Sequence, residues 1–188
     1  MNNQFAFYLI KLAPKWIDFC VLRKDTIVLY IKSEHIYSFF LLLKTHINTK
    51  VQVLVDLTAV DFPSRELRFD IVYNSLSIFY NYRICVKTCV DEITPVDSIT
   101  SIYPAAGWLE RECWDMFGIF FKNHSDLRRI LTDYGFEGHP LRKDFPLTGF
   151  NEVRYDDAEK RVITEPLQIS QTFRVFDFHS PWDQEKIK

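Results

Sequence analysis

The sequence lacks a large excess of one charge and a long apolar run. Its 188 residues carry 23 basic and 25 acidic side chains, so it lacks the basic excess that nucleic-acid binding needs. The longest apolar runs, 5–10 and 39–43, are far shorter than the roughly 20 residues that cross a bilayer. The start resembles neither a secretory signal nor a transit peptide. We therefore expect no nucleic-acid partner and no membrane span, and a chain that stays where it is made or is already processed.

Cysteine is scarce as well. Cys20, Cys85, Cys89 and Cys113 are scattered through a chain with enough apolar residues for a core, so we expect reduced, buried thiols rather than a disulfide framework. Cys85 and Cys89 would share one face of a strand, but no second cysteine pair or nearby histidine completes four zinc ligands. The sequence therefore predicts no metal site.

Glycine is absent from the first hundred residues. All five glycines lie between positions 107 and 149, which predicts dense regular structure followed by a part rich in turns. Apolar residues make up 47% of the chain and charged residues 26%, and this composition excludes disorder of the whole chain. The length fits one domain and a tail. We place the domain at 1–149 and the tail at 150–188.

Hydrophobic spacing predicts the elements of the domain. Ser33 can cap a helix in which Ile36, Phe39 and Phe40 follow helical spacing, and several segments alternate or are rich in β-branched residues, as strands are. The predicted helices are 4–12, 33–46 and 104–118, and the predicted strands are 16–22 and 26–31 (a hairpin), 51–60, 67–79 and 82–90. Because helices do not alternate strictly with strands, we expect an α+β fold in which helices cover a mainly antiparallel sheet.

Three carboxylates, Glu110, Glu112 and Asp115, fall on the last predicted helix, which is a pattern that acid–base or metal chemistry can use. Glu110 and Glu112 are two residues apart and so point to different sides, and no Glu-x-x-His pattern builds a metal pair. The simpler interpretation is that ion pairs hold the helix, with Arg111 and Asp115 as an i,i+4 pair. One face of this helix is predicted to carry Trp108, Leu109, Glu112, Cys113 and Met116.

Basic pairs and two histidines follow this helix. Arg128 and Arg129 can clamp an anionic ligand, or they can neutralise the acids at Glu110, Glu112, Asp126 and Asp133. His124 and His139 have no ligand spacing and are interpreted as structural hydrogen bonders. No phosphate loop or nucleophile elbow is present. From the residues alone, two alternatives stay open: a generic adaptor, and a stand-alone enzyme whose acid or base is Glu110, Glu112, His124 or His139.

Residues 105–149 carry a specific pattern of more than forty residues. It runs Glu-Arg-Glu, two residues, an acid, two apolar residues, then a histidine and a basic-apolar run, here Glu110, Arg111, Glu112, Asp115, Met116, Phe117, His124, Arg128, Ile130 and Leu131. The segment 134–147 is equally typical. Together they resemble the signature region of the thirty-kilodalton subunit family of respiratory complex I, the proton-pumping NADH:ubiquinone oxidoreductase. One departure is Ser125, where relatives commonly have proline.

The resemblance implies a non-catalytic core subunit of the hydrophilic arm. Such a subunit has a small α+β domain and an extended tail, and it lies against the forty-nine-kilodalton subunit and other peripheral-arm subunits near the quinone-reducing module. The family binds neither flavin nor iron–sulfur clusters, so FMN, the clusters and ubiquinone are expected on neighbouring subunits. No catalytic, cofactor-binding or metal-binding residue is assigned. The lack of a presequence and the Phe-, Tyr- and Ile-rich composition favour a mitochondrially encoded member on the matrix side of the inner membrane; a bacterial member would lie on the cytoplasmic face.

The resemblance also implies which residues form the scaffold and the interface. They are Glu110, Arg111, Glu112, Trp114, Asp115, Gly118, His124, Arg128, Arg129, Gly138, His139, Pro140, Arg142, Lys143 and Asp144. The tail has no glycine and is interrupted by Pro166 and Pro181, yet it is too apolar to stay free in solvent. We expect it to lie extended on a partner through Phe173, Phe176, Phe178 and Trp182, with its own domain as the alternative surface.

Overall fold

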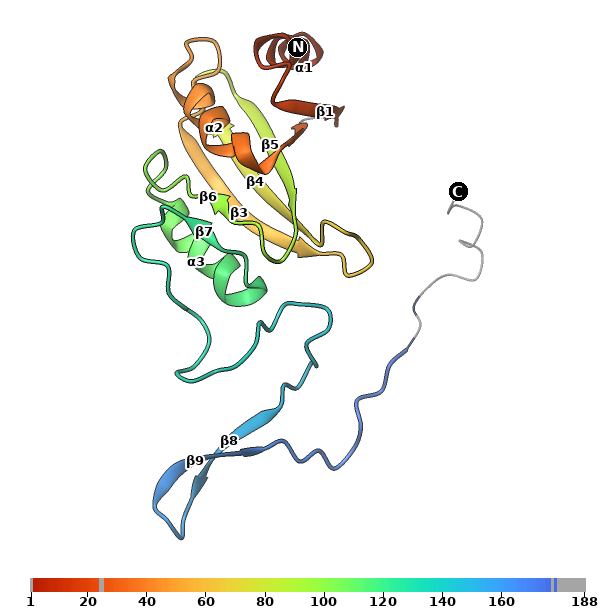
Figure 1. The fold of residues 1–188 in the computed structure, drawn as a ribbon, viewed down its shortest axis with the longest axis vertical. Helices are drawn as coiled ribbons and strands as arrows, with labels where there is room; N and C mark the ends of the chain where they lie inside the picture. Colours follow the sequence, from red (N-terminus) through yellow and green to blue (C-terminus); the bar gives the residue numbers. More distant parts are fainter. Residues whose placement is uncertain (1, 24–25, 177, 179–188) are drawn as a thin grey trace. The chain divides into compact units, whose positions relative to one another are not determined.

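The computed structural model describes residues 2–23, 26–176 and 178, and it divides the chain into two compact units, 1–146 and 147–188. The first unit holds the main sheet and the helices, and the second holds a separate hairpin followed by chain without regular structure (Figure 1). Among the residues described, no helix is both long and apolar enough to cross a membrane.

The N-terminal segment forms the predicted helix and hairpin. Helix α1 (Asn2–Leu12) ends before Pro14, and strands β1 (Ile17–Leu22) and β2 (Thr26–Ile31) pair antiparallel. The ring of Phe5 on α1 stacks on that of Tyr82, with centroids 4.0 Å apart. This stacking holds the helix against the sheet.

The second helical segment begins differently from the prediction. Residues Ser33–His35 form a 3₁₀ turn (η1), and α2 (Ile36–Thr45) follows directly. The predicted cap at Ser33 is wrong, because Lys32 precedes η1, His35 precedes α2, and neither makes a side-chain capping hydrogen bond. The backbone meets part of the need instead, since the His35 N–H donates to the Lys32 carbonyl at 3.0 Å. The buried face of α2 is the predicted one, with Ile36, Phe39, Phe40 and Leu43.

Five strands form the main sheet in the order β1-β2-β5-β4-β3. Strands β3 (Val53–Asp61), β4 (Phe69–Ser77) and β5 (Tyr82–Val90) run antiparallel, and Asn81 turns between the last two with φ of 55°. Strand β5 pairs with β2 in parallel, because the chain crosses over through α2, β3 and β4 before it returns beside β2. The predicted α+β fold with a mainly antiparallel sheet is confirmed.

The helices pack on one face of this sheet. Phe40 of α2 lies 5.1 Å from Tyr73, and Phe117 of α3 (Ala106–Phe117) lies 6.3 Å from Phe69, measured between ring centroids. Tyr73 and Phe69 point to the same side of β4, since strand residues alternate with a period of two. The short strands β6 (Val96–Asp97) and β7 (Phe121–Lys122), which the sequence did not predict, pair in parallel and bring together the chain before and after α3.

Helix α3 buries only part of the predicted face, through Cys113 and Met116. Trp108 and Glu112 are exposed, whereas the carboxylates of Glu110 and Asp115 are buried. The burial of the two acids was not predicted, because it depends on polar partners outside the helix. Gly118 ends the helix as predicted, in the left-handed conformation with φ of 79°.

The second unit contains a hairpin that the sequence did not predict. Strands β8 (Asn151–Asp156) and β9 (Arg161–Pro166) pair antiparallel, and Lys160 has φ of 53°. Phe173, Phe176 and Phe178 follow without regular structure and are exposed. The fourth predicted docking residue, Trp182, lies outside the described residues.

Candidate functional site

Glu110 is a fully buried carboxylate on α3. It accepts a hydrogen bond from the Ser98 hydroxyl at 2.6 Å and another from the Ile99 N–H at 2.8 Å. Burial raises the pKa of Glu110 to about 7, and the two hydrogen bonds only partly oppose that effect. The side chain thus ties α3 to the chain that follows β6, and it is occupied rather than available to a substrate.

His124 lies beside Glu110 but makes its hydrogen bonds to the backbone. Its Nδ1 accepts from the Asp126 N–H at 3.0 Å, so the proton of the neutral ring sits on Nε2. Nε2 is 3.2 Å from the Gly107 carbonyl oxygen and 3.8 Å from Oε2 of Glu110, so the hydrogen bond goes to the carbonyl. His124 therefore bonds to the main chain on both ring nitrogens, the geometry expected of a structural histidine.

Asp115 organises the loop that follows β7. Its Oδ2 accepts the N–H groups of Ile130 (3.2 Å), Leu131 (2.8 Å) and Thr132 (3.0 Å), and its Oδ1 accepts the Thr132 hydroxyl at 2.7 Å. Burial opposes ionisation, but the hydrogen bonds from these three residues outweigh it, so the pKa of Asp115 lies below its ordinary value. A buried carboxylate in a nest of amides fixes residues 130–132 against α3.

The arginines near Asp115 do not pair as predicted. Arg111 makes no ion pair with Asp115; its Nε and Nη2 donate to the carbonyls of Arg128 (3.1 Å) and Arg129 (3.2 Å). The predicted i,i+4 pair is wrong because Asp115 turns inward to the loop amides. The Nη1 of Arg129 lies 3.4 Å from Asp115, and Arg128 forms an exposed pair with Asp126 at 2.9 Å. Among the acids predicted to neutralise Arg128 and Arg129, only Asp126 forms an ion pair with either arginine, and it pairs with Arg128.

His139 and Arg142 cover the C-terminal end of α3. The Nδ1 of His139 lies 3.0 Å from the Asp115 carbonyl oxygen, and the Nε of Arg142 donates to the Phe117 carbonyl at 2.6 Å. Burial lowers the pKa of His139. Gly118 lies under both side chains: a Cβ there would sit 2.6 Å from His139 Nε2 and from Arg142 Nη2. Glycine is therefore required at position 118 both for its positive φ and for this close approach.

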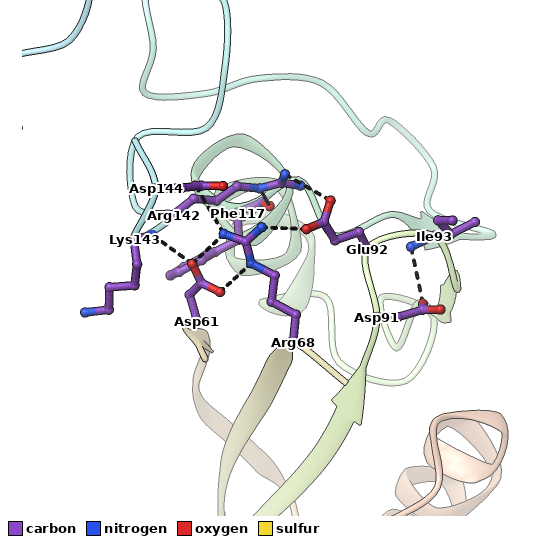
Figure 2. Close-up of polar contacts among 9 residues, drawn as sticks. All are labelled: Asp61, Arg68, Asp91, Glu92, Ile93, Phe117, Arg142, Lys143 and Asp144. Carbon is purple, nitrogen blue, oxygen red and sulfur yellow. Dashed lines mark hydrogen bonds and ion pairs between the residues drawn. The ribbon is translucent and has the colours of Figure 1, made fainter. Parts of the chain in front are cut away.

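A second polar cluster joins the end of the sheet to residues 142–144 (Figure 2). Arg68 donates two hydrogen bonds to the buried carboxylate of Asp61, at 2.7 and 2.9 Å, and pairs with Glu92 at 2.5 Å and Asp144 at 3.1 Å. The Lys143 N–H also donates to Asp61, at 2.7 Å. The hydrogen bonds from Arg68 are the main reason that the pKa values of Asp61 and Asp144 are lowered. The clustering of Asp61, Arg68 and Glu92 was not predicted, because nothing in their local sequence distinguishes them from surface charges.

The remaining signature residues make fewer polar contacts or none that the structure records. The Trp114 ring packs edge-on against His139 and Phe120. The Gly138 carbonyl accepts a hydrogen bond from Arg129 at 2.9 Å. Pro140 is half-buried, and Glu112 is exposed. Most of the signature thus fastens residues 128–146 to the domain.

The loop 128–146 exposes apolar side chains although buried polar contacts fix its backbone. Its polar contacts point inward, while the side chains of Leu131, Tyr134 and Leu141 point outward; Leu131 is 63% exposed and Tyr134 is fully exposed. We call these three residues the loop surface. Apolar side chains held outward by a rigid polar framework are typical of a protein–protein contact.

The stand-alone enzyme alternative finds little support in this geometry. Glu110 and His124 are near each other but buried, and their polar atoms are taken by the main chain and Ser98. Glu112 lies on another side of α3, and His139 covers the helix end. The candidate acids and bases therefore do not converge on an accessible cleft.

Comparison with known proteins decides the family. The family model described as "Respiratory-chain NADH dehydrogenase, 30 Kd subunit" matches residues 29–151. The chain belongs to this family. It is 55% identical to NADH-ubiquinone oxidoreductase subunit 9 of Prototheca wickerhamii, over 98% of this chain and 96% of that protein. It is 59% identical to NADH dehydrogenase [ubiquinone] iron-sulfur protein 3 of Marchantia polymorpha, over 98% and 95%.

A solved structure shares the fold. A chain of the membrane-bound sulfane sulfur reductase, an archaeal respiratory membrane complex, superposes with a TM-score of 0.66 and 25% identity over 78% of this chain and 86% of that chain. As a member of the thirty-kilodalton family, the chain is a subunit of NADH–ubiquinone oxidoreductase.

A relative named "iron-sulfur protein 3" raises the question of whether the cysteines of this chain could hold an iron–sulfur cluster. A cluster needs several thiolates around one point. Cys20 and Cys113 pack into the core on the helix side of the sheet, whereas Cys89 lies on the other side, 3.1 Å from Asp70. Within the described residues, no group of three His, Cys, Asp or Glu could hold a metal ion. The donors in the described part of the chain are therefore too dispersed to surround a cluster.

Proposed function

We propose that the chain is a non-catalytic core subunit of the peripheral arm. In this role it holds the quinone-reducing module against the forty-nine-kilodalton subunit while electrons pass from NADH to ubiquinone. Its contribution is positional, since small displacements of reacting groups are expensive in rate. FMN, the iron–sulfur clusters and ubiquinone are then carried by neighbouring subunits, in keeping with the dispersed thiols of this chain.

The observation that carries this proposal is the set of exposed apolar side chains on the loop 128–146. The nest around Asp115 and the cluster around Arg68 make residues 128–146 rigid, and the loop surface presents Leu131, Tyr134 and Leu141 outward. Preorganised apolar anchors bind with a small entropic cost. We assign the loop surface, rather than the buried signature residues, to direct contact with the forty-nine-kilodalton subunit.

The tail is a second contact in this proposal. An isolated two-stranded hairpin such as β8–β9 is marginal in water, and one of its faces carries Val153, Tyr155 and Val162, all exposed. Deletion of 173–188 should release the chain from its partners and leave the sheet domain folded. Loss of the domain's thermal unfolding transition in the truncated chain would contradict this assignment.

We place the complex at the mitochondrial inner membrane, with this subunit on the matrix side, or on the cytoplasmic face if the chain is bacterial. The test is a native gel of the membranes, probed for this chain and stained for NADH dehydrogenase activity. Comigration with activity in a very large complex is expected. Migration as a free species of about 22.4 kDa would overturn the proposal and reopen the acid–base enzyme.

The role of the loop surface is tested in the same gel. Leu131→Ser with Tyr134→Ser should lower the amount of assembled complex, because the anchors are lost while the framework remains. Ile93→Ser is the matched control, since Ile93 is 88% exposed but lies outside the loop. Arg128→Ala should also lower assembly rather than turnover. Normal assembly with impaired quinone reduction would show that these residues act in the reaction rather than in assembly.

A further inference from the structure

A groove lined by aromatic rings lies where α1 meets the turn between β4 and β5, far along the chain from the loop surface. It has a volume of about 330 Å³ and is lined by Gln4, Phe5, Tyr8, Asn48, Tyr80 and Tyr82. The Tyr80 and Tyr82 rings are 5.9 Å apart between centroids, and Phe5 stacks on Tyr82. We call these six residues the aromatic groove.

Hydrogen bonds between three separate segments preform the aromatic groove. The Tyr80 hydroxyl donates to the Ile47 carbonyl at 3.2 Å, and the Asn48 side-chain amide donates to the Tyr8 hydroxyl at 3.0 Å. His46 Nδ1 accepts the Asn48 N–H, so its Nε2 carries the proton and donates to the Tyr8 hydroxyl at 3.2 Å. The walls of the groove are therefore tied together before any ligand arrives.

This arrangement leaves one donor of the groove available. The Tyr8 oxygen accepts two hydrogen bonds, and its own proton has no acceptor among the residues that the structure describes. A phenol that already accepts two hydrogen bonds is a good donor to an anionic oxygen, because chains of hydrogen bonds polarise one another. The groove thus offers a hydroxyl donor among apolar rings.

The rim of the groove is apolar and exposed. Ile47 is 72% exposed, Ile78 is 64% exposed and Phe79 is 67% exposed. Lys50 Nζ stands 4.3 Å above the Phe79 ring centroid. Large apolar side chains gathered around a concave site mark a protein contact rather than scattered surface residues.

The three segments that supply the lining of the groove carry basic but no acidic residues. The chain has 25 acidic residues, and none lies in the segments 2–12, 36–55 and 71–90 that build the groove and its rim. The basic residues in these segments are Lys11, Lys44, Lys50, Arg83 and Lys87. Lys44 and Lys87 bind elsewhere, to the Ile102 carbonyl and the Tyr30 ring, so Lys50 over Phe79 is the base on the rim that can pair with a carboxylate.

We propose that the aromatic groove binds a second protein subunit, through a segment that presents an apolar side chain next to a carboxylate. The apolar side chain enters between Phe5, Tyr8 and Tyr80, and the carboxylate accepts a hydrogen bond from the Tyr8 hydroxyl and pairs with Lys50. A protein is favoured over a lipid surface because the site is a concave pocket with directional donors, whereas interfacial membrane binding uses a protruding apolar face. This inference rests on the proposed function as a subunit.

Carbodiimide cross-linking of the intact complex tests the proposal, because it joins a lysine amine only to a carboxylate in direct contact. A link from Lys50 to an Asp or Glu of another subunit is expected. Lys50→Arg keeps the charge but forms no such link, so it must abolish that product. Lys122, which pairs with Asp97 of its own chain at 3.1 Å, gives an internal link and serves as the positive control.

Hydroxyl-radical labelling of the same complex supplies a second readout. Phe79 and Tyr80 should lose their labelling in the complex relative to the isolated full chain. Three results would each overturn the proposal: full labelling of Phe79 and Tyr80 in a complex that comigrates with activity, Lys50 links to the chain's own residues 147–188 only, or protection of the isolated chain by phosphatidylglycerol vesicles without protection in the complex. Failure to comigrate would instead refute the proposed function.

Discussion

Removal of the Asp115 carboxylate should detach the loop surface from α3. Asp115 accepts three main-chain N–H groups and the Thr132 hydroxyl, and a hydrogen bond to a charged group contributes about 1.5–3 kcal/mol. These bonds share one carboxylate and do not add, so we expect Asp115→Ala to lower the free energy of unfolding by about 3–5 kcal/mol, as for a broken buried ion pair. Asp115→Asn keeps one oxygen for the amides and should cost about 1–3 kcal/mol.

Urea unfolding of the purified full chain measures these losses, and hydrogen exchange at Ile130, Leu131 and Thr132 locates them. Glu112→Ala is the matched control on the same helix, since Glu112 is exposed. Because the pKa of Asp115 is lowered on folding, its contribution is present above about pH 4 and is lost as the pH falls below that value. If the three amides stayed protected in Asp115→Ala, or if its loss matched that of Glu112→Ala, the nest would not hold the loop.

Three further predictions concern other polar contacts. Gly118→Ala should lower the free energy of unfolding by about 1–2 kcal/mol from its positive φ alone, and further through the clash with His139. Gly135 also has a positive φ, of 73°, but open space around its Cβ, so Gly135→Ala measures the first effect by itself. Equal losses of melting temperature in the two variants would refute the clash. Arg68→Ala should lower the free energy of unfolding in urea by about 3–5 kcal/mol. Arg154→Ala, which breaks a solvent-exposed pair, is the control and should change it much less; similar losses would contradict the role of the cluster. Folding raises the pKa of Glu110 from 4.5 to about 7, so its contribution is complete below about pH 4.5 and is lost as the pH rises through 7. Glu110→Gln should therefore flatten the fall in stability between pH 5 and pH 8 in urea titrations, and an unchanged slope would show that Glu110 does not cause it.

Local patterns predicted most of the fold. The alternation in β3 to β5, the helical spacing of Ile36, Phe39 and Phe40, and the stop at Gly118 all lie within one segment each, so the sequence reports them directly. The hairpin β8–β9 escaped prediction because its strands are mostly exposed and lack a buried face to mark their period. The parallel pairing of β2 with β5 was also missed, since it joins segments more than fifty residues apart.

The candidate site also has features that the sequence predicted and features that it did not. The signature itself was recognisable, and so was the divergence of Glu110 and Glu112, because helix geometry fixes the angle between neighbouring positions. The partner of Asp115 was misjudged, because Arg111 is near in sequence but the amides at 130–132 are nearer in space. Asp61 and Arg68 carried no signal at all, since their burial depends on residues 142–144 closing over them.

By itself the sequence determined the class of fold, the family and the near balance of charge, because composition, periodicity and a long motif are properties of the chain alone. The tertiary structure decided which charges are buried, which partners they take and which side chains face outward. The physical reason is that desolvation and hydrogen-bond geometry depend on distances in space. Tyr134 and Phe79 became candidate contacts only once the fold had left them exposed.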